Sequence, residues 1–204
     1  MKSLYTPPHT SWTHRLARLC VRPLLDSPVT PNHLTAARLV SGVAASAAFM
    51  VGDPSWNLWG GILWLVSCFL DRADGELARL ADACSPNGHL FDYYSDIGVN
   101  SLFFFAIGVG LRDGALGVWA IALGALGGAS VGLASVFSEK LEEKNATGDK
   151  AYAGILGFDF DDILYLFGPA AWANLFSFLL IGASVGAPFF AIITWLRLRR
   201  QAVG

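Results

Sequence analysis

Long apolar segments, separated by polar or glycine-containing connections, dominate the chain and predict helices that cross a membrane. About 20 helical residues cover the roughly 30 Å of a bilayer's hydrocarbon layer. We therefore expect six transmembrane helices near residues 34–51, 56–70, 92–111, 115–137, 163–181 and 185–198. The second and sixth segments are short, so each must take in flanking residues or tilt.

The connections between these segments are of two kinds. Tight turns are expected at Asp53-Pro54, at Arg112-Asp113-Gly114, and at Gly182 with Gly186. Two longer polar connections cover residues 71–91 and 138–162. Small residues recur inside the fourth segment at Gly124, Gly127, Gly128 and Gly132, and such residues let membrane helices approach closely.

The N-terminal region lacks the continuous apolar core of a secretory signal. Residues 11–25 instead mix apolar side chains with arginines, which predicts an amphipathic helix lying in the membrane interface; a disordered basic tail is the alternative. The expected organisation is a juxtamembrane amphipathic helix over residues 1–28 and a six-helix transmembrane domain over residues 29–204.

Composition agrees with an all-α integral membrane protein. Hydrophobic residues make up 54% of the chain and charged residues only 15%, against about a quarter in soluble domains. The net charge of −2 argues against nucleic-acid binding. Three widely spaced cysteines form no disulfide framework and no CxxC site.

Basic residues predict the orientation of the chain. Cytoplasmic loops carry an excess of lysine and arginine. With the N-terminus in the cytoplasm, six crossings place every one of the 14 lysines and arginines except Arg112 on the cytoplasmic side. We therefore expect both termini and both long polar connections inside, in the inner membrane of a bacterial cell.

Four aspartates are spaced to share helix faces at the cytoplasmic side. Asp71 and Asp74 fall on one face of a helix that continues the second segment, and Asp92 and Asp96 fall on one face at the start of the third. Gly75, Ala78 and Gly88 keep these same faces bare of large side chains.

Carboxylates gathered in this way need a balancing charge. Two like charges 4 Å apart repel by roughly 4 kcal/mol at an effective dielectric of 20. The two nearby arginines, Arg72 and Arg79, are too few for four aspartates, and oxygen ligands favour Mg²⁺ or Mn²⁺. We expect two ions, which together can clamp a pyrophosphate, and we expect Arg79 to bind phosphate. Helix caps and interfacial charges are the alternative role for the aspartates.

The full pattern, D-x2-D-G-x2-A-R-x8-G-x3-D-x3-D, runs from Asp71 to Asp96 and resembles the signature of the CDP-alcohol phosphotransferases. The stretch from Thr30 to Arg38 looks like that family's entry into the first transmembrane helix. The specific likeness covers residues 30–96.

The resemblance implies six membrane helices, a frequent homodimer, and metal held by the signature aspartates. It implies that the CDP group binds beside the signature residues, that CMP is released, and that Asp96 is the base that deprotonates the acceptor. The expected metal ligands are Asp71, Asp74, Asp92 and Asp96. The expected substrate-binding residues are Asp74, Gly75, Ala78, Arg79, Asn32, Thr35 and Arg38, although Arg38 could instead reach the membrane interface.

A second polar group on the same side is a candidate acceptor site. It comprises Asp159, Asp161, Asp162, Lys140 and Lys144. Alternatively, the aspartates could simply lie at a helix start, where negative charge is favourable. The lysines could belong to a cytoplasmic loop that follows the positive-inside rule.

The predicted function is Mg²⁺-dependent transfer of a phosphatidyl group from CDP-diacylglycerol to a polar alcohol in phospholipid biosynthesis. One alternative is the same chemistry with a soluble donor, such as CDP-choline, CDP-ethanolamine or CDP-inositol, and a lipid or polyol acceptor. This alternative is suggested by the run from Ser85 to Asp92, which looks somewhat like the choline/ethanolamine form of the motif. More remote alternatives are a divalent-cation transporter and a catalytically inactive scaffold.

Overall fold

The computed structural model describes residues 5–6, 9–144, 152 and 154–203, and nearly all of them are helical. The helices are α1 (Trp12–Val21), η1 (Arg22–Leu24), α2 (Pro31–Val51), α3 (Pro54–Leu80), α4 (Pro86–Gly110), α5 (Trp119–Lys144), η2 (Phe160–Leu166), α6 (Phe167–Trp172) and α7 (Phe176–Val203). Two short strands, β1 (Tyr5–Thr6) and β2 (Gly154–Ile155), pair antiparallel, with Tyr5 opposite Ile155.

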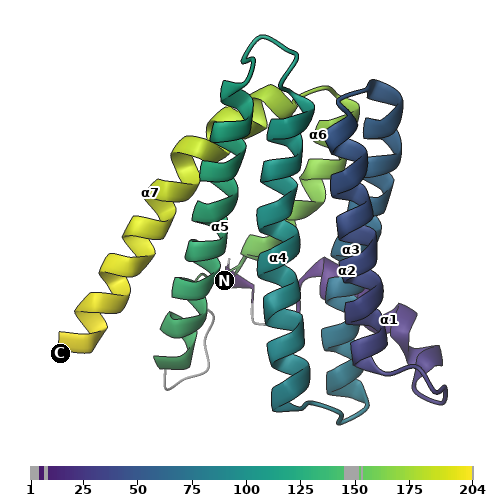
Figure 1. Ribbon diagram of the computed structural model, residues 1–204. Coiled ribbons are helices and arrows are strands. Elements are labelled where there is room, and N and C mark those ends of the chain that lie inside the picture. The colour runs from purple at the N-terminus through teal and green to yellow at the C-terminus, as the bar shows by residue number, and fades with distance from the viewer. Residues whose placement is uncertain (1–4, 7–8, 145–151, 153, 204) are drawn as a thin grey trace.

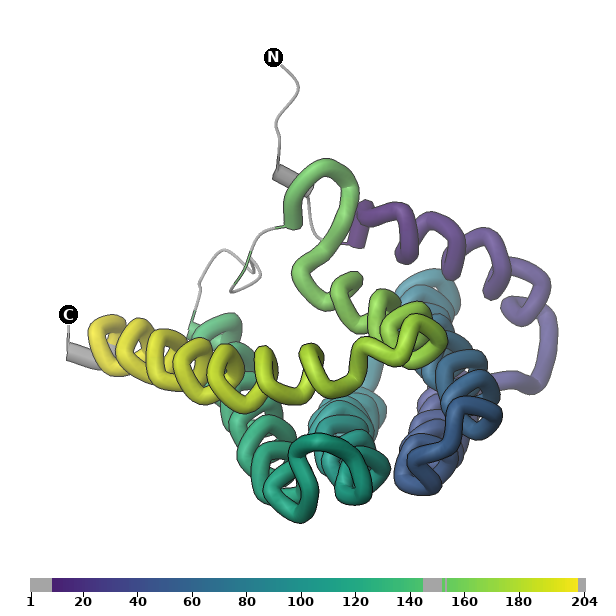
Figure 2. Tube along the Cα trace, turned by 90° about the horizontal axis from the view of Figure 1, so that it is seen from above, coloured from purple at the N-terminus to yellow at the C-terminus, as the bar shows by residue number. Residues whose placement is uncertain are grey.

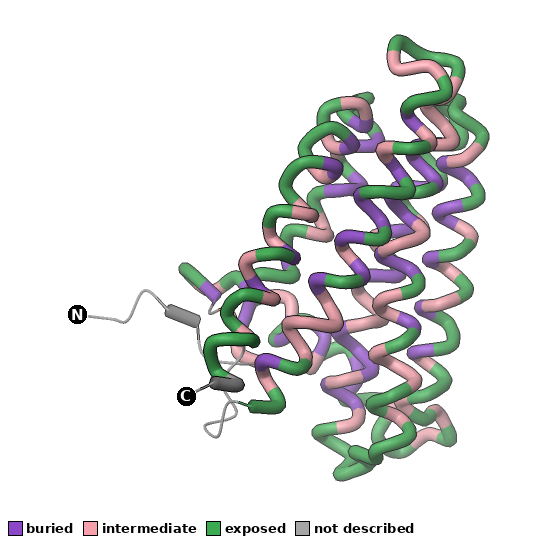
Figure 3. Tube along the Cα trace, turned by 60° about the vertical axis from the view of Figure 1, so that its left-hand side comes forward, coloured by how far each residue is buried: buried purple, intermediate pink, exposed green. Residues whose placement is uncertain are grey.

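The long helices form one bundle (Figure 1). Viewed along the bundle, α3, α2, α4 and α5 follow one another in that order along one side, and α6 and α7 run along the other (Figure 2). Helix α1 crosses the lower end of α3. Buried residues face the interior of the bundle, whereas the ends and the outer faces are exposed (Figure 3).

Within the described part of the chain, three helices are long and apolar enough to cross a membrane by length and composition: α2, α5 and residues Phe176–Gln201 of α7. Helices α3 and α4 run beside α2 over comparable lengths and carry their charged residues toward the lower end (Figure 1). Helices of this length and composition are those of an integral membrane protein. The count of six crossings and the orientation stay predictions.

The chain departs from the expected pattern around the fifth segment. The structure has a 3₁₀ segment, η2, followed by the short helix α6, and the chain then turns at residues 173–175, where Asn174 adopts a φ of 54°. The turn predicted at Gly182 and Gly186 is wrong, because both residues lie inside the continuous helix α7. Asparagine tolerates the left-handed conformation that this turn requires, and membrane helices accept internal glycine.

Aromatic side chains and glycines pack the centre of the bundle. Phe103 lies against Trp64 and Phe167, with ring centroids 4.3 and 4.9 Å apart. Between α4 and α5, a Cβ added to Gly128 would lie 2.4 Å from the carbonyl oxygen of Ser101. The expected close approach of helices at the small residues of α5 is therefore present.

Helix α1 has two distinct faces. Ser11 caps its start by accepting a hydrogen bond from the amide of His14, and His14 and Ala17 face the protein interior. Trp12 and Leu19 are more than half exposed on the opposite face. This amphipathic division suits a helix at a membrane surface, and the placement of α1 in the interface stays a prediction.

Candidate active site

The lower ends of α2, α3 and α4 bring the predicted aspartates together. Helix α3 continues without a break from its apolar part to Leu80, so it carries Asp71 and Asp74 below that part. Helix α4 begins at Pro86, and the Ser85 side chain caps it by accepting a hydrogen bond from the Gly88 amide. Asp92 and Asp96 follow within its first three turns.

Arg38 lies between the two pairs of aspartates. Its Nε is 2.8 Å from Asp71 Oδ1, and its Nη2 is 2.5 Å from Asp96 Oδ1. The Arg38 side chain is 3% exposed, so its charge interacts with these carboxylates through little water. The sequence predicts that Arg38 reaches a substrate phosphate or the membrane interface; in the structure its side chain bridges α3 and α4.

Two uncharged residues also donate hydrogen bonds to the aspartates. Thr35 Oγ1 donates a hydrogen bond to Asp74 Oδ2 at 2.6 Å, and Asn100 Nδ2 donates one to Asp96 Oδ1 at 2.7 Å. Thr35 was expected at the site, but Asn100 was missed. The only sequence signal for Asn100 is its position one helical turn after Asp96.

The aspartates fit a hard divalent cation. Asp71 and Asp92 lie close enough to Asp74 to act electrostatically on it. Asp92 Oδ1 is buried and has no hydrogen-bond partner among the described residues. A buried carboxylate oxygen without a hydrogen-bond partner among the described residues, close to other carboxylates, suits Mg²⁺ or Mn²⁺.

Among the described residues, one group of three acidic or histidine side chains has its ligand atoms close together, and it lies apart from the four aspartates. Atoms of His9, His14 and Glu76 all lie within 4.8 Å of one another. However, Glu76 Oε2 is 2.7 Å from Arg18 Nε, and Glu76 Oε1 is 2.7 Å from Arg79 Nη2. These two guanidinium groups already supply the positive charge that a metal would bring, so the group is better described as a network of ion pairs.

The remaining signature residues lie on the same side. Gly75 makes room for Arg79, because a Cβ at Gly75 would be 3.2 Å from Arg79 Nη2. At the start of α2, Asn32 Oδ1 would lie 3.2 Å from a Cβ at Gly88. Asn32 therefore reaches the first turn of α4. Gly75 and Gly88, which the sequence predicts to leave room for a ligand, also leave room for the side chains of Arg79 and Asn32.

The second acidic cluster is mostly occupied by protein contacts. Asp162 is buried, accepts a hydrogen bond from Thr13 Oγ1 at 2.7 Å, and lies 3.5 Å from Arg72 Nη2. Asp159 is also buried, with Oδ2 3.2 Å from His14 Nε2. Their carboxylates join η2 to α1 and α3 and cap the start of η2, which favours the alternative role at a helix start; a role in acceptor binding stays a prediction.

Asp161 differs from its neighbours. Its side chain is 53% exposed, lies 3.7 Å from Arg72 Nη2, and borders the pocket described next. Lys140 and Lys144 are exposed on the last turns of α5, and their role stays a prediction.

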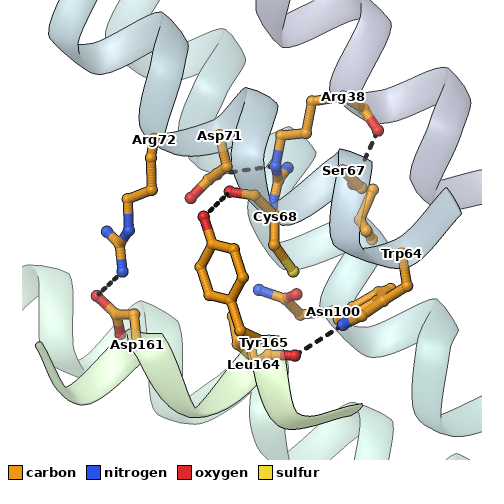
Figure 4. Close-up of a pocket in the computed structure, with 11 residues that line it drawn as sticks. Arg38, Trp64, Ser67, Cys68, Asp71, Arg72, Asn100, Asp161, Leu164 and Tyr165 are labelled. Carbon is orange, nitrogen blue, oxygen red and sulfur yellow. Dashed lines mark hydrogen bonds and ion pairs between the residues drawn. The ribbon is translucent and has the colours of Figure 1, made fainter. Parts of the chain in front are cut away.

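A pocket opens between the aspartates and η2 (Figure 4). Arg38, Asp71 and Asn100 line its polar part. Tyr165 closes another side, where its hydroxyl donates a hydrogen bond to the Cys68 carbonyl at 2.9 Å. Of the four signature aspartates, Asp71 lines this pocket, so a small polar molecule bound there would lie beside Asp71.

The helical bundle thus carries the four signature aspartates on α3 and α4, where Arg38 of α2 joins two of them. The sequence profile of the CDP-alcohol phosphatidyltransferase family matches residues 28–198. The chain belongs to this family, whose members are transferases that use a divalent metal.

Two known proteins resemble the chain in different ways. It is 33% identical over 105 residues to a bifunctional IPC transferase and DIPP synthase from Rubrobacter xylanophilus. The match covers 50% of this chain and 23% of that protein, so the chain spans about a quarter of the relative. The fold is similar to that of Mycobacterium tuberculosis phosphatidylinositol phosphate synthase with CDP-DAG bound, with a TM-score of 0.58, 17% identity and 92% of each chain covered.

Proposed function

We propose that this protein transfers a phosphatidyl group from CDP-diacylglycerol to the hydroxyl of a polar alcohol and releases CMP. The observation that carries the proposal is that Arg38 joins Asp71 of α3 to Asp96 of α4, within a chain that belongs to the family. The similar fold of a synthase solved with CDP-DAG supports this choice of donor.

The proposed ligands of the divalent metal are Asp71, Asp74, Asp92 and Asp96. When bound there, Mg²⁺ or Mn²⁺, as two ions, would supply positive charge for the donor's pyrophosphate oxygens. Thr35 and Asn100 orient the aspartates through the hydrogen bonds described above. Ala78, Arg79 and Asn32 complete the proposed donor site around Gly75 and Gly88.

The proposed reaction is a displacement at phosphorus. Asp96 takes the proton of the acceptor hydroxyl, and that oxygen bonds to the phosphorus that carries diacylglycerol. The bond from this phosphorus to the bridging oxygen breaks, and the bridging oxygen leaves with CMP. An aspartate is a weak base for an alcohol, so most of the rate must come from charge stabilisation and positioning.

The pocket is the proposed place for the acceptor, because two residues that line it, Arg38 and Asn100, both contact Asp96. Asp161 remains a candidate contact to it, because its side chain is half exposed and borders the pocket. Lys140 and Lys144 are further proposed contacts to the acceptor, on the same side of the membrane. Arg38 and Arg72, which also line the pocket, are both ion-paired with aspartates.

We also propose that the active site and both termini face the cytoplasm, that the protein lies in a bacterial inner membrane, and that it forms a homodimer. The orientation is proposed from the distribution of basic residues. The homodimer is proposed from the family resemblance. The alternative of a soluble CDP-alcohol donor retains one supporting feature, the sequence from Ser85 to Asp92, which begins α4.

A donor panel tests the proposed function. Purified protein in detergent is given Mg²⁺, a set of alcohols, and either radiolabelled CDP-diacylglycerol or soluble CDP-alcohols with diacylglycerol. We expect CMP release and a labelled phospholipid with CDP-diacylglycerol. CMP release only with a soluble donor would favour the alternative, and metal flux into liposomes without CMP release would favour transport.

A further inference from the structure

Glu76 is a buried carboxylate within the signature, at a position where the pattern specifies no residue. Its residue is 0% exposed. Oε1 is 2.7 Å from Arg79 Nη2 and 3.0 Å from His14 Nδ1, and Oε2 is 2.7 Å from Arg18 Nε. Glu76 therefore joins the signature arginine of α3 to two residues of α1.

Arg79 is held in place from two directions. Its guanidinium lies over Gly75, where a Cβ would be 3.2 Å from Nη2 and 3.4 Å from Nη1. On another side, Glu76 accepts a hydrogen bond from Nη2. A guanidinium has five N–H groups in a planar fork, so Arg79 can keep its contact with Glu76 and still present other N–H groups to a phosphate.

Helix α1 holds Glu76 in turn. Arg18 contributes a hydrogen bond, and this bond and the charge of Glu76 raise the pKa of Arg18 above its usual value. His14 faces Glu76 with one ring nitrogen and Asp159 with the other, at 3.0 and 3.2 Å. The carboxylate is thus fixed from α1 through both of its oxygens.

We propose that Glu76 is a positioning residue that holds Arg79 ready for the donor's phosphate, and that α1 keeps Glu76 in place. This inference rests on the proposed function, because it assigns Arg79 to the donor site. It gives α1 a role in donor binding in addition to any contact with the membrane. Neither Glu76 nor α1 touches the reacting atoms in this account.

Steady-state kinetics with CDP-diacylglycerol test the proposal. Glu76→Gln keeps the shape of the side chain but weakens its hold on Arg79. We expect the KM for the donor to rise roughly tenfold, as is typical when a supporting partner of a ligand-binding residue is lost. The value of kcat at saturating donor should change little. Glu76→Asp keeps the charge and should recover part of the loss.

Arg18→Met provides a second variant, because Arg18 is partly exposed and lies on α1. This substitution removes the partner of Glu76 Oε2. It should raise the KM for the donor, but by less than Glu76→Gln does. Arg15→Met is the matched control on the same helix. Arg15 donates to the Thr10 carbonyl and stacks on Trp12, so its loss should leave the donor KM unchanged.

Binding of CMP, measured by calorimetry without turnover, separates this inference from the proposed function. Weaker CMP binding by Glu76→Gln and Arg18→Met, with Arg15→Met unchanged, supports the inference. Unchanged CMP affinity and donor KM in folded Glu76→Gln would overturn it. If Glu76→Gln does not fold, unchanged values in Arg18→Met would overturn it. A wild-type protein that binds CMP but shows no transfer would contradict the proposed function alone.

Discussion

At the scale of single residues, the site depends on how four acidic side chains share limited positive charge. Arg38 bridges Asp71 and Asp96 from a nearly water-free position. Asp92 keeps a buried oxygen without a partner among the described residues. The single positive charge of Arg38 therefore does not balance the charge of four aspartates, and a divalent cation could still bind to them.

Replacing the proposed base tests this arrangement directly. Asp96→Asn should preserve the fold and reduce CMP release roughly a hundredfold or more, because the amide cannot accept the acceptor's proton. Asp113→Asn is the matched control, since Asp113 is 85% exposed in the connection between α4 and α5. Equal CMP release from Asp96→Asn and wild type would remove Asp96 from its role.

Thr35 provides a milder test of the metal site. Thr35→Val keeps the volume of the side chain but removes the 2.6 Å hydrogen bond to Asp74. We expect the Mg²⁺ concentration for half-maximal activity to rise roughly tenfold, since such partners orient metal ligands. Thr35→Ser retains the hydroxyl and should resemble wild type. An unchanged Mg²⁺ requirement in Thr35→Val would contradict a role for Thr35 in orienting Asp74.

At the scale of elements, spacing along the chain predicted the faces of α3 and α4 well. A carboxylate every third or fourth residue can lie on one side of a helix whatever the helix packs against. The partners Arg38, Asn100 and Glu76 were not predicted in their observed roles, because their contacts depend on how helices meet. The break between α6 and α7 was misplaced for a related reason: glycine signals both turns and close helix packing.

Helix packing at Gly128 leads to a prediction about stability. Gly128→Ala would place a Cβ 2.4 Å from the Ser101 carbonyl oxygen, so α4 and α5 must separate. We expect a loss of about 1–3 kcal/mol and a lower apparent Tm in detergent. Gly182→Ala in α7 is the control, because a Cβ there meets nothing within 4 Å. Equal Tm values for the two variants would show that this close approach does not limit stability.

At the scale of the whole molecule, the bundle places α1, the aspartates and η2 toward one end (Figure 1). The connection that contains Arg112 lies at the other end. The excess of basic residues at the first end predicts that this end faces the cytoplasm. The sequence predicted this orientation because the rule needs only the order of segments and the positions of the charges.

Cysteine labelling tests the orientation. Cys20 and Cys84 are exposed toward the end of the active site, and Cys68 is buried. A membrane-impermeant maleimide should leave the wild-type protein unlabelled in intact cells and label it after permeabilisation. Asp113→Cys should be labelled in intact cells. Labelling of the wild type in intact cells would reverse the orientation.

The central claim is that aspartates from two adjacent helices form one site for a hard cation that transfer requires. The most direct measurement is CMP release from CDP-diacylglycerol by the purified protein before chelation, after exhaustive chelation, and after Mg²⁺ is restored. The account predicts loss of release on chelation, recovery with Mg²⁺, and no recovery for Asp92→Asn at the same concentration. Full release under strict chelation would contradict it.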